Sequence, residues 1–174
     1  MTLPTPIADL LGRSSIAVTI GDLTQADCPL VGASERFLTM TGYDRDEVIG
    51  RNCRFLQPND GAGPVRDRMR EFIYSDGAAD DQFLIPNERK DGTPFINLVY
   101  MSKLLRNGAP WLILASQFDV TRATAQSAAA YAETLARDVQ ALRDVLSPDQ
   151  IEIMGSYTIM ANTTALVART RLDY

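Results

Sequence analysis

Residues 50–57 read Gly-Arg-Asn-Cys-Arg-Phe-Leu-Gln and place one cysteine, Cys53, among two cationic and two carboxamide side chains. Arginine neighbours stabilise a thiolate, and they also bind phosphate through paired, charge-assisted hydrogen bonds. A single cysteine is, however, more often a small buried apolar residue than a nucleophile. Taken alone, this stretch leaves open whether Cys53 is structural or reactive.

Short apolar stretches on both sides of this octet predict β-strands. Turn-rich residues lie between them, with Asp-Gly and Asn-Gly pairs before the last two stretches, as in antiparallel hairpins. The predicted strands are residues 16–20, 29–33, 81–88, 93–105 and 111–120. Helical pieces are expected over residues 34–55 and 64–75. The order of two strands, helices and three strands predicts an α+β fold, in which a five-stranded antiparallel sheet carries its helices on one face.

Both ends of the chain predict helical additions to this sheet. Residues 1–14 contain a short amphipathic stretch and are expected to form an N-terminal cap. Within residues 122–174, apolar side chains recur at alternating spacings of three and four, which predicts a coiled-coil-like seam that covers the open sheet face or pairs with a second copy. The seam consists of Ala125, Ala128, Ala132, Leu135, Val139, Leu142 and Leu146. Ser147 as N-cap and Pro148 at the first helical position predict a second helix, so we expect a helix-turn-helix-like extension.

The composition narrows the classes of function. The 174 residues include no histidine, which argues against zinc sites, serine hydrolase triads and a phospho-accepting histidine, and we expect no metal. A net charge of −5 disfavours nucleic acid as a partner. No apolar run approaches the roughly 20 residues of a membrane span, and the first residues do not resemble a secretory signal. We therefore expect a cytoplasmic protein whose two cysteines remain thiols.

Residues 15–121 resemble the LOV (light, oxygen, voltage) photoreceptors, the flavin-binding branch of the PAS fold. The octet quoted above matches the signature of that family without a break. Residues 41–50 (TGYDRDEVIG), Arg70, residues 87–98 (NERKDGTPFINL) and Gln117 also fall where the family places them. The resemblance implies a noncovalent flavin, FMN in preference to FAD, between the helices and the concave face of the sheet.

The resemblance also implies which side chains hold the flavin. Arg54 and Arg70 would clamp the phosphate, since a dianion suits two charge-assisted pairs. Carboxamides would bind the edge of the ring, which needs both donors and acceptors. The implied carboxamide contacts are Asn52, Gln57, Asn87, Asn97 and Gln117. The implied apolar walls are Val31, Leu56, Ile85, Leu98 and Phe118.

In this family blue light drives a reversible bond from the cysteine sulfur, here Cys53, to flavin carbon C4a, while the neighbouring ring nitrogen gains a proton. Gln117 would report the change, because its amide can offer either a donor or an acceptor. Thr121 follows four residues later, so the signal has a short path into the C-terminal helices. The resemblance implies a photoreceptor and not an enzyme.

Output is expected through a light-dependent homodimer formed by the C-terminal helices, or through an unknown signalling protein. The alternatives are a PAS ligand sensor without photochemistry and a flavin-based redox sensor; Cys53 separates them from the photoreceptor. Arg66 receives no role. Cys28 is expected to be an exposed or half-buried thiol without function, and Pro86 is expected at an edge or bulge position.

Overall fold

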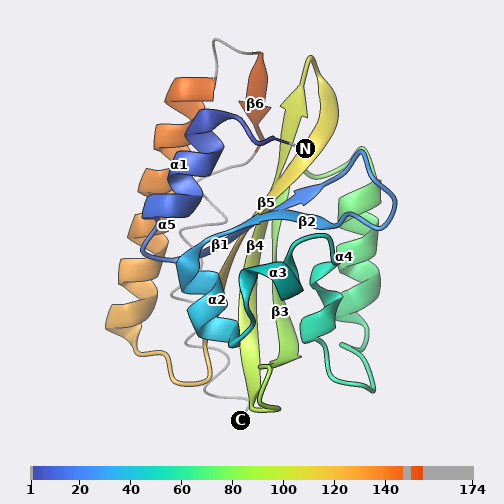
Figure 1. The fold of residues 1–174 in the computed structure, drawn as a ribbon, viewed down its shortest axis with the longest axis vertical. Helices are drawn as coiled ribbons and strands as arrows, with labels where there is room; N and C mark the ends of the chain where they lie inside the picture. Colours follow the sequence, from blue (N-terminus) through green and yellow to red (C-terminus); the bar gives the residue numbers. More distant parts are fainter. Residues whose placement is uncertain (1, 147–149, 155–174) are drawn as a thin grey trace.

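The centre of the molecule is an antiparallel sheet of six strands among the residues that the structure, a computed structural model, describes: 2–146 and 150–154. The strands are β1 (Ala17–Asp22), β2 (Leu30–Ala33), β3 (Asp80–Glu88), β4 (Pro94–Arg106), β5 (Ala109–Asp119) and β6 (Ile151–Ile153). Their order is β2-β1-β5-β4-β3, and β6 pairs with one end of β4 (Figure 1). The predicted α+β fold is confirmed, with one more strand than expected.

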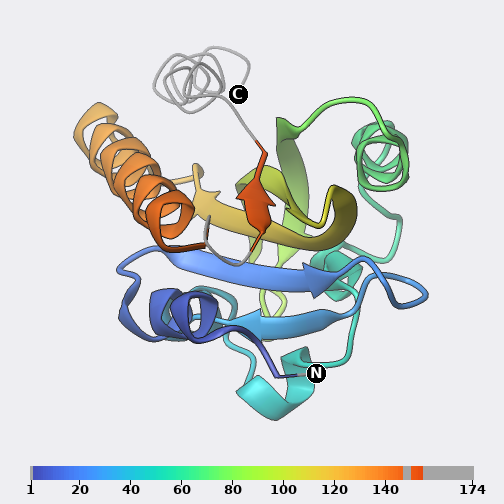
Figure 2. The ribbon, with the colours of Figure 1, turned by 90° about the horizontal axis from the view of Figure 1, so that it is seen from above.

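Helices lie on both faces of this sheet. They are α1 (Thr5–Arg13), α2 (Glu35–Thr41), α3 (Arg45–Val48), the 3-10 helix η1 (Cys53–Leu56), α4 (Val65–Tyr74) and α5 (Ala125–Leu146). Figure 2 shows α1 and α5 side by side on one side of the sheet and α4 on the other. The helices between β2 and β3 leave one face free, and the two terminal helices cover it.

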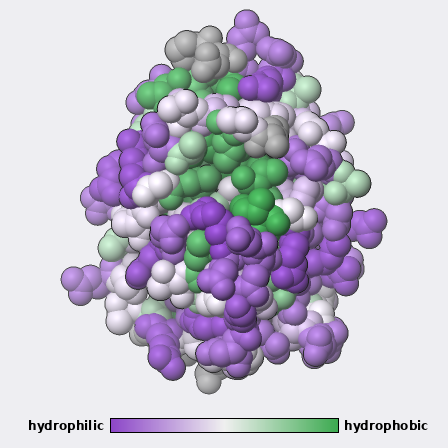
Figure 3. All heavy atoms as spheres, in the orientation of Figure 1, coloured by the Kyte–Doolittle hydropathy of each residue, from purple (hydrophilic) through white to green (hydrophobic). Residues whose placement is uncertain are grey.

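Side chains of the long central strands alternate between these two faces, as the pleat of a strand requires. The side chains packed with α1 and α5 include Leu98, Tyr100, Leu112 and Leu114. Those packed with α4 include Val99, Met101, Ile113 and Ala115. In the view of Figure 3, apolar atoms gather over β1 and β2 beside α1, whereas the region over α2 and α3 is hydrophilic.

Helix α5 confirms the helix predicted from the apolar seam. Its buried residues are Ala128, Tyr131, Leu135, Val139, Leu142 and Leu146, and they pack on the sheet. Ala125 is exposed and Ala132 is half-buried, because the buried row passes through Tyr131 instead. Ser14 Oγ donates a 3.0 Å hydrogen bond to Asp138 Oδ2 and ties the end of α1 to α5. The seam therefore covers the open sheet face in this structure.

The helix predicted to begin at Ser147 is wrong where the structure describes it. Ile151–Ile153 form β6, which pairs antiparallel with Leu104–Arg106 of β4. The Ile-Glu-Ile sequence alternates, so both isoleucines are buried and Glu152 is exposed, as a half-buried strand requires. The rest of the predicted helix-turn-helix, residues 147–149 and 155–174, lies outside the described residues. No helix among the described residues is long and apolar enough to span a membrane.

Candidate ligand-binding site

A cavity of about 480 Å³ lies between the sheet and the segment that carries η1 and α4. Its volume is within the range of small-molecule sites, roughly 300–1,000 Å³. Nine of the residues named above as flavin contacts line it: Asn52, Cys53, Arg54, Gln57, Arg70, Ile85, Asn87, Asn97 and Gln117. Two helical segments and three strands, the η1 region, α4, β3, β4 and β5, thus bring polar side chains to one place.

Cys53 begins η1, and its thiol faces the cavity. Gly50 adopts a left-handed backbone (φ 85°), which an L-residue resists, and so turns the chain ahead of η1. Asn52 Oδ1 accepts a 3.0 Å hydrogen bond from the Arg54 backbone N–H and caps η1. Burial, and to a smaller degree the neighbouring Cys28, raises the pKa of the Cys53 thiol to about 12. The thiol is therefore protonated near neutral pH, and the thiolate suggested by the flanking arginines does not form.

Three buried carboxamides lie on neighbouring strands of the cavity wall: Asn87 on β3, Asn97 on β4 and Gln117 on β5. Asn97 Nδ2 donates to Asn87 Oδ1 at 2.9 Å, and Gln117 Nε2 donates to Thr19 Oγ1 at 2.9 Å. Pro86, which precedes Asn87, does not interrupt the sheet, because β3 is an edge strand and an edge strand tolerates proline.

Two oxygens of this row, Asn97 Oδ1 and Gln117 Oε1, have no hydrogen-bond partner among the residues that the structure describes. An unpaired buried acceptor costs about 1–3 kcal/mol. Since both side chains line the cavity, a ligand that donates hydrogen bonds from its edge would satisfy them.

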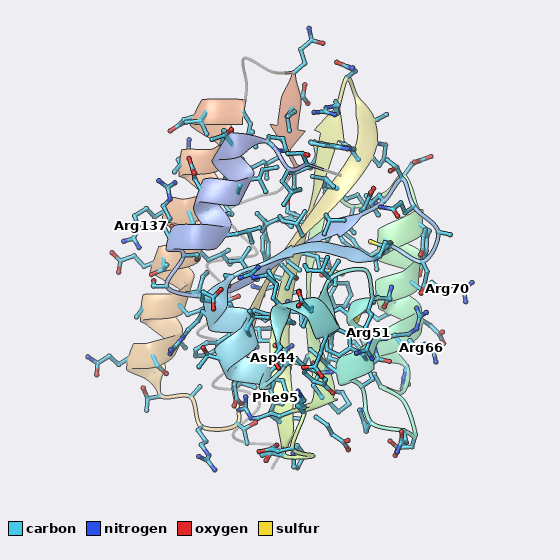
Figure 4. All side chains as sticks on the ribbon, viewed as in Figure 1. Asp44, Arg51, Arg66, Arg70, Phe95 and Arg137 are labelled. Carbon is cyan, nitrogen blue, oxygen red and sulfur yellow. The ribbon has the colours of Figure 1, made fainter. Side chains whose placement is uncertain are left out.

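Cations line the mouth of the cavity. Arg66 and Arg70 project from α4 (Figure 4), and Arg54 follows Cys53 on η1. Arg54 Nη1 donates a 2.6 Å hydrogen bond to Asp27 Oδ1, and this contact lowers the pKa of the Asp27 carboxyl. Asn52 Nδ2 donates to the Asp27 carbonyl at 2.5 Å, so residues of the octet hold the turn at residue 27 beside the mouth. The mouth suits an anionic group such as a phosphate.

The prediction is wrong for four of the five apolar residues that were expected to line the cavity. Val31, Leu98 and Phe118 lie on the opposite face of the sheet, in the cluster with α1 and α5. Asn97 and Gln117 face the cavity, so their chain neighbours Leu98 and Phe118 must point away from it. Leu56 packs beneath the site with other residues of the β1–α3 region, and only Ile85 lines the cavity as predicted.

Several residues that line the cavity were not predicted from the sequence to contact a ligand. Arg66 reaches the mouth, and Thr19 contacts Gln117. Cys28 is buried and lines the cavity, contrary to the exposed or half-buried thiol expected, and its backbone is left-handed (φ 46°). Burial and the carboxyls of Asp22 and Asp27 raise the pKa of Cys28 to about 11. Among the other apolar residues that line the cavity, Val99 and Ala115 lie at i±2 from the carboxamides Asn97 and Gln117.

The arrangement suits a flat ligand with a mixed donor and acceptor edge against the sheet, an anionic tail at the mouth and a thiol beside it. Among the residues that the structure describes, no group of three or more carboxyl or thiol side chains is placed to hold a metal ion.

Comparison with known proteins identifies the class. A family model described as "PAS domain" matches residues 15–122. Blue-light-activated histidine kinase 1 of Erythrobacter litoralis is 37% identical over 115 residues, which make up 66% of this chain and 31% of the kinase. Two solved structures align with 97% of this chain and 96% of their own, each with a TM-score of 0.82. They are the RsLOV d2 variant, 32% identical, and the Rhodobacter sphaeroides LOV protein, 28% identical.

The chain therefore belongs to the PAS domain family. Within that family it is a LOV protein. It spans less than a third of the length of the Erythrobacter kinase.

Proposed function

We propose that this protein is a blue-light receptor that binds FMN noncovalently and forms a reversible bond between the Cys53 sulfur and flavin carbon C4a. The observation that carries the proposal is one cavity lined by a thiol and by two unpaired carboxamide oxygens. A similar protein that is named as activated by blue light supports it. We propose a sensor and not an enzyme, since the thiol serves a reaction of the cofactor itself.

The cavity residues fit a flavin. The ring edge carries carbonyl acceptors and an imide donor, and carboxamides match both. Asn97 Oδ1 offers an acceptor for the imide donor, and Gln117 can turn either end of its amide toward the ring. Arg54 and Arg70, joined by Arg66, would hold a terminal phosphate at the mouth, which favours FMN over FAD.

When bound, the flavin supplies a light-excited ring whose C4a carbon accepts the sulfur and whose neighbouring nitrogen accepts a proton. The Cys53 thiol would provide both the sulfur and the proton. Its raised pKa keeps the proton on the sulfur until the reaction, so no separate acid is required.

Gln117 would pass the change to α5 through the sheet. The residues on either side of it, Ser116 and Phe118, point to the other face and both contact Tyr131 of α5. Ser116 Oγ and Tyr131 Oη lie 2.6 Å apart, and the Phe118 and Tyr131 rings stack with centroids 4.7 Å apart and an interplanar angle of 19°. A shift of β5 at Gln117 therefore acts on one residue of α5 from two sides.

The proposed output is a light-dependent homodimer through the C-terminal helices, with an unknown signalling protein as the other candidate partner. The apolar seam of α5 packs on the sheet, so its pairing with a second copy requires that light loosen this contact. Light scattering in darkness and under blue light tests the proposal, because equal masses in both states contradict it.

The first experiment is an absorbance spectrum before and after blue light, followed in darkness. The wild type is expected to lose its visible flavin bands and to regain them in darkness. Cys53→Ala should bind flavin without bleaching, whereas Cys28→Ala, which changes the other cavity thiol, should bleach as the wild type does.

Three results would contradict the proposal. Bleaching that persists in Cys53→Ala excludes the thiol bond. A coloured but unresponsive wild type favours the flavin-based redox sensor. A protein that stays colourless after flavin is supplied favours a PAS ligand sensor without photochemistry.

A further inference from the structure

Thr19 is a cavity residue whose side chain contacts the proposed reporter directly. It lies on β1, two strand positions from Ala17, which pairs with Gln117 of β5. Its side chain is 1% exposed, and Oγ1 accepts the 2.9 Å hydrogen bond from Gln117 Nε2. This hydrogen bond holds one end of the Gln117 amide against β1, so the other end faces the cavity.

The Gln117 amide and the Thr19 hydroxyl differ in how they can form hydrogen bonds. A primary amide has a donor end and an acceptor end, whereas a hydroxyl both donates and accepts. Thr19 can therefore accept from Nε2, as it does here, or donate to Oε1 after the amide turns over. In the first orientation Gln117 presents Oε1 to the cavity, and in the second it presents Nε2.

We propose that Thr19 is a positioning residue that pairs with the Gln117 amide in both orientations. The inference rests on the proposed function, in which a ring nitrogen beside Gln117 is an acceptor in darkness and carries a proton after light. Nε2 toward the ring suits the dark state, and Oε1 toward the ring suits the lit state. Because Thr19 can pair with either end, the amide has a hydrogen-bond partner on β1 before and after it turns over.

The structure shows the first of the two orientations. Gln117 Oε1 has no partner among the described residues, while Nε2 is held by Thr19, so the amide presents an acceptor to the cavity. An aliphatic side chain of the same shape would leave one end of the buried amide without a partner in either orientation. Valine at this position would fill the same space but could neither donate nor accept a hydrogen bond.

The test compares Thr19→Val with Thr19→Ser, which keeps the hydroxyl. In ligand-free protein labelled with ¹⁵N, the Gln117 side-chain NH₂ resonance is expected to shift in Thr19→Val and to stay near its wild-type position in Thr19→Ser. In flavin-loaded protein with ¹³C-labelled glutamine, Gln117→Leu assigns the carbonyl band in light-minus-dark infrared spectra. The dark carbonyl band is expected at higher frequency in Thr19→Val, where the hydroxyl donor is missing.

The outcomes separate this inference from the proposed function. If the wild type bleaches and recovers but the dark Gln117 band is the same in Thr19→Val, Thr19 does not hold the dark orientation and the inference is overturned. A Gln117 resonance shift in Thr19→Ser as large as that in Thr19→Val points to packing and also overturns it. A wild type that never bleaches overturns the proposed function together with this inference.

Discussion

Replacing Tyr131 with phenylalanine removes one hydroxyl from the contact between β5 and α5 and keeps the ring. Tyr131 and Ser116 are both buried, and their oxygens lie 2.6 Å apart. The substitution leaves the Ser116 hydroxyl without this partner, at a cost of about 1–3 kcal/mol. The stack on Phe118 remains, because it depends on the ring alone.

The cost can be measured by urea unfolding in darkness, followed by circular dichroism. With an m-value of about 2 kcal/mol/M, the unfolding midpoint should fall by about 0.5–1.5 M. Ser116→Ala should cost a similar amount, since it leaves the Tyr131 hydroxyl unpaired instead. The double variant should be more stable than the sum of the two losses predicts, by a coupling energy of about 0.5–3 kcal/mol.

The same variant tests the path from the cavity to α5. Tyr131→Phe should bleach and recover with flavin as the wild type does, because Tyr131 lies on the far face of the sheet. Its light-dependent change in mass by scattering should be reduced. Additive stability losses in the cycle, or an unchanged light response, would refute the reasoning that β5 acts on α5 through this hydroxyl.

Other predictions follow from strand alternation, burial and the thiols. Ile85→Ala should weaken flavin binding in fluorescence titrations, whereas Leu98→Ala, whose side chain packs on the opposite face, should lower stability and leave binding unchanged. Leu135→Ala in α5 should destabilise the protein by about 2–5 kcal/mol in urea, because the side chain is buried in the cluster on the sheet. Burial raises the pKa values of Cys28 and Cys53 to about 11 and about 12, from an ordinary value of 9.0. Above pH 9 the unfolded chain loses these protons first, so the free energy of unfolding should fall between about pH 9 and 11, and less steeply when both cysteines are alanine.

The polar part of the site could be predicted from the sequence because its residues belong to motifs at fixed spacing. The apolar part could not be taken from the motifs, and strand alternation was the missing constraint. Once Asn97 and Gln117 face the cavity, Leu98 and Phe118 cannot, and the true wall residues are found two positions away. Cys28 was harder to place, since no sequence pattern predicts the left-handed backbone that it adopts.

The end of the described chain shows how a local signal is overruled. Ser147 and Pro148 match a helix start, and the prediction followed them. The Ile-Glu-Ile sequence four residues later alternates with period two, and the exposed end of β4 offers it backbone partners. Tertiary pairing decided between the two patterns, and a stretch of three residues is too short for periodicity alone to decide.

Strand β4 holds the polypeptide on both sides of α5. Near its beginning, the Ile96 carbonyl accepts from the Val120 N–H at 3.0 Å, and Thr121 Oγ1 accepts from the Ile96 N–H at 2.9 Å. Near its other end, β6 pairs with Leu104–Arg106, and Met154 N–H donates to the Lys103 carbonyl at 2.9 Å. The chain is thus anchored to opposite ends of β4 before and after helix α5. An outward movement of α5 must therefore begin with the loss of the hydrogen bonds at one of these two anchors.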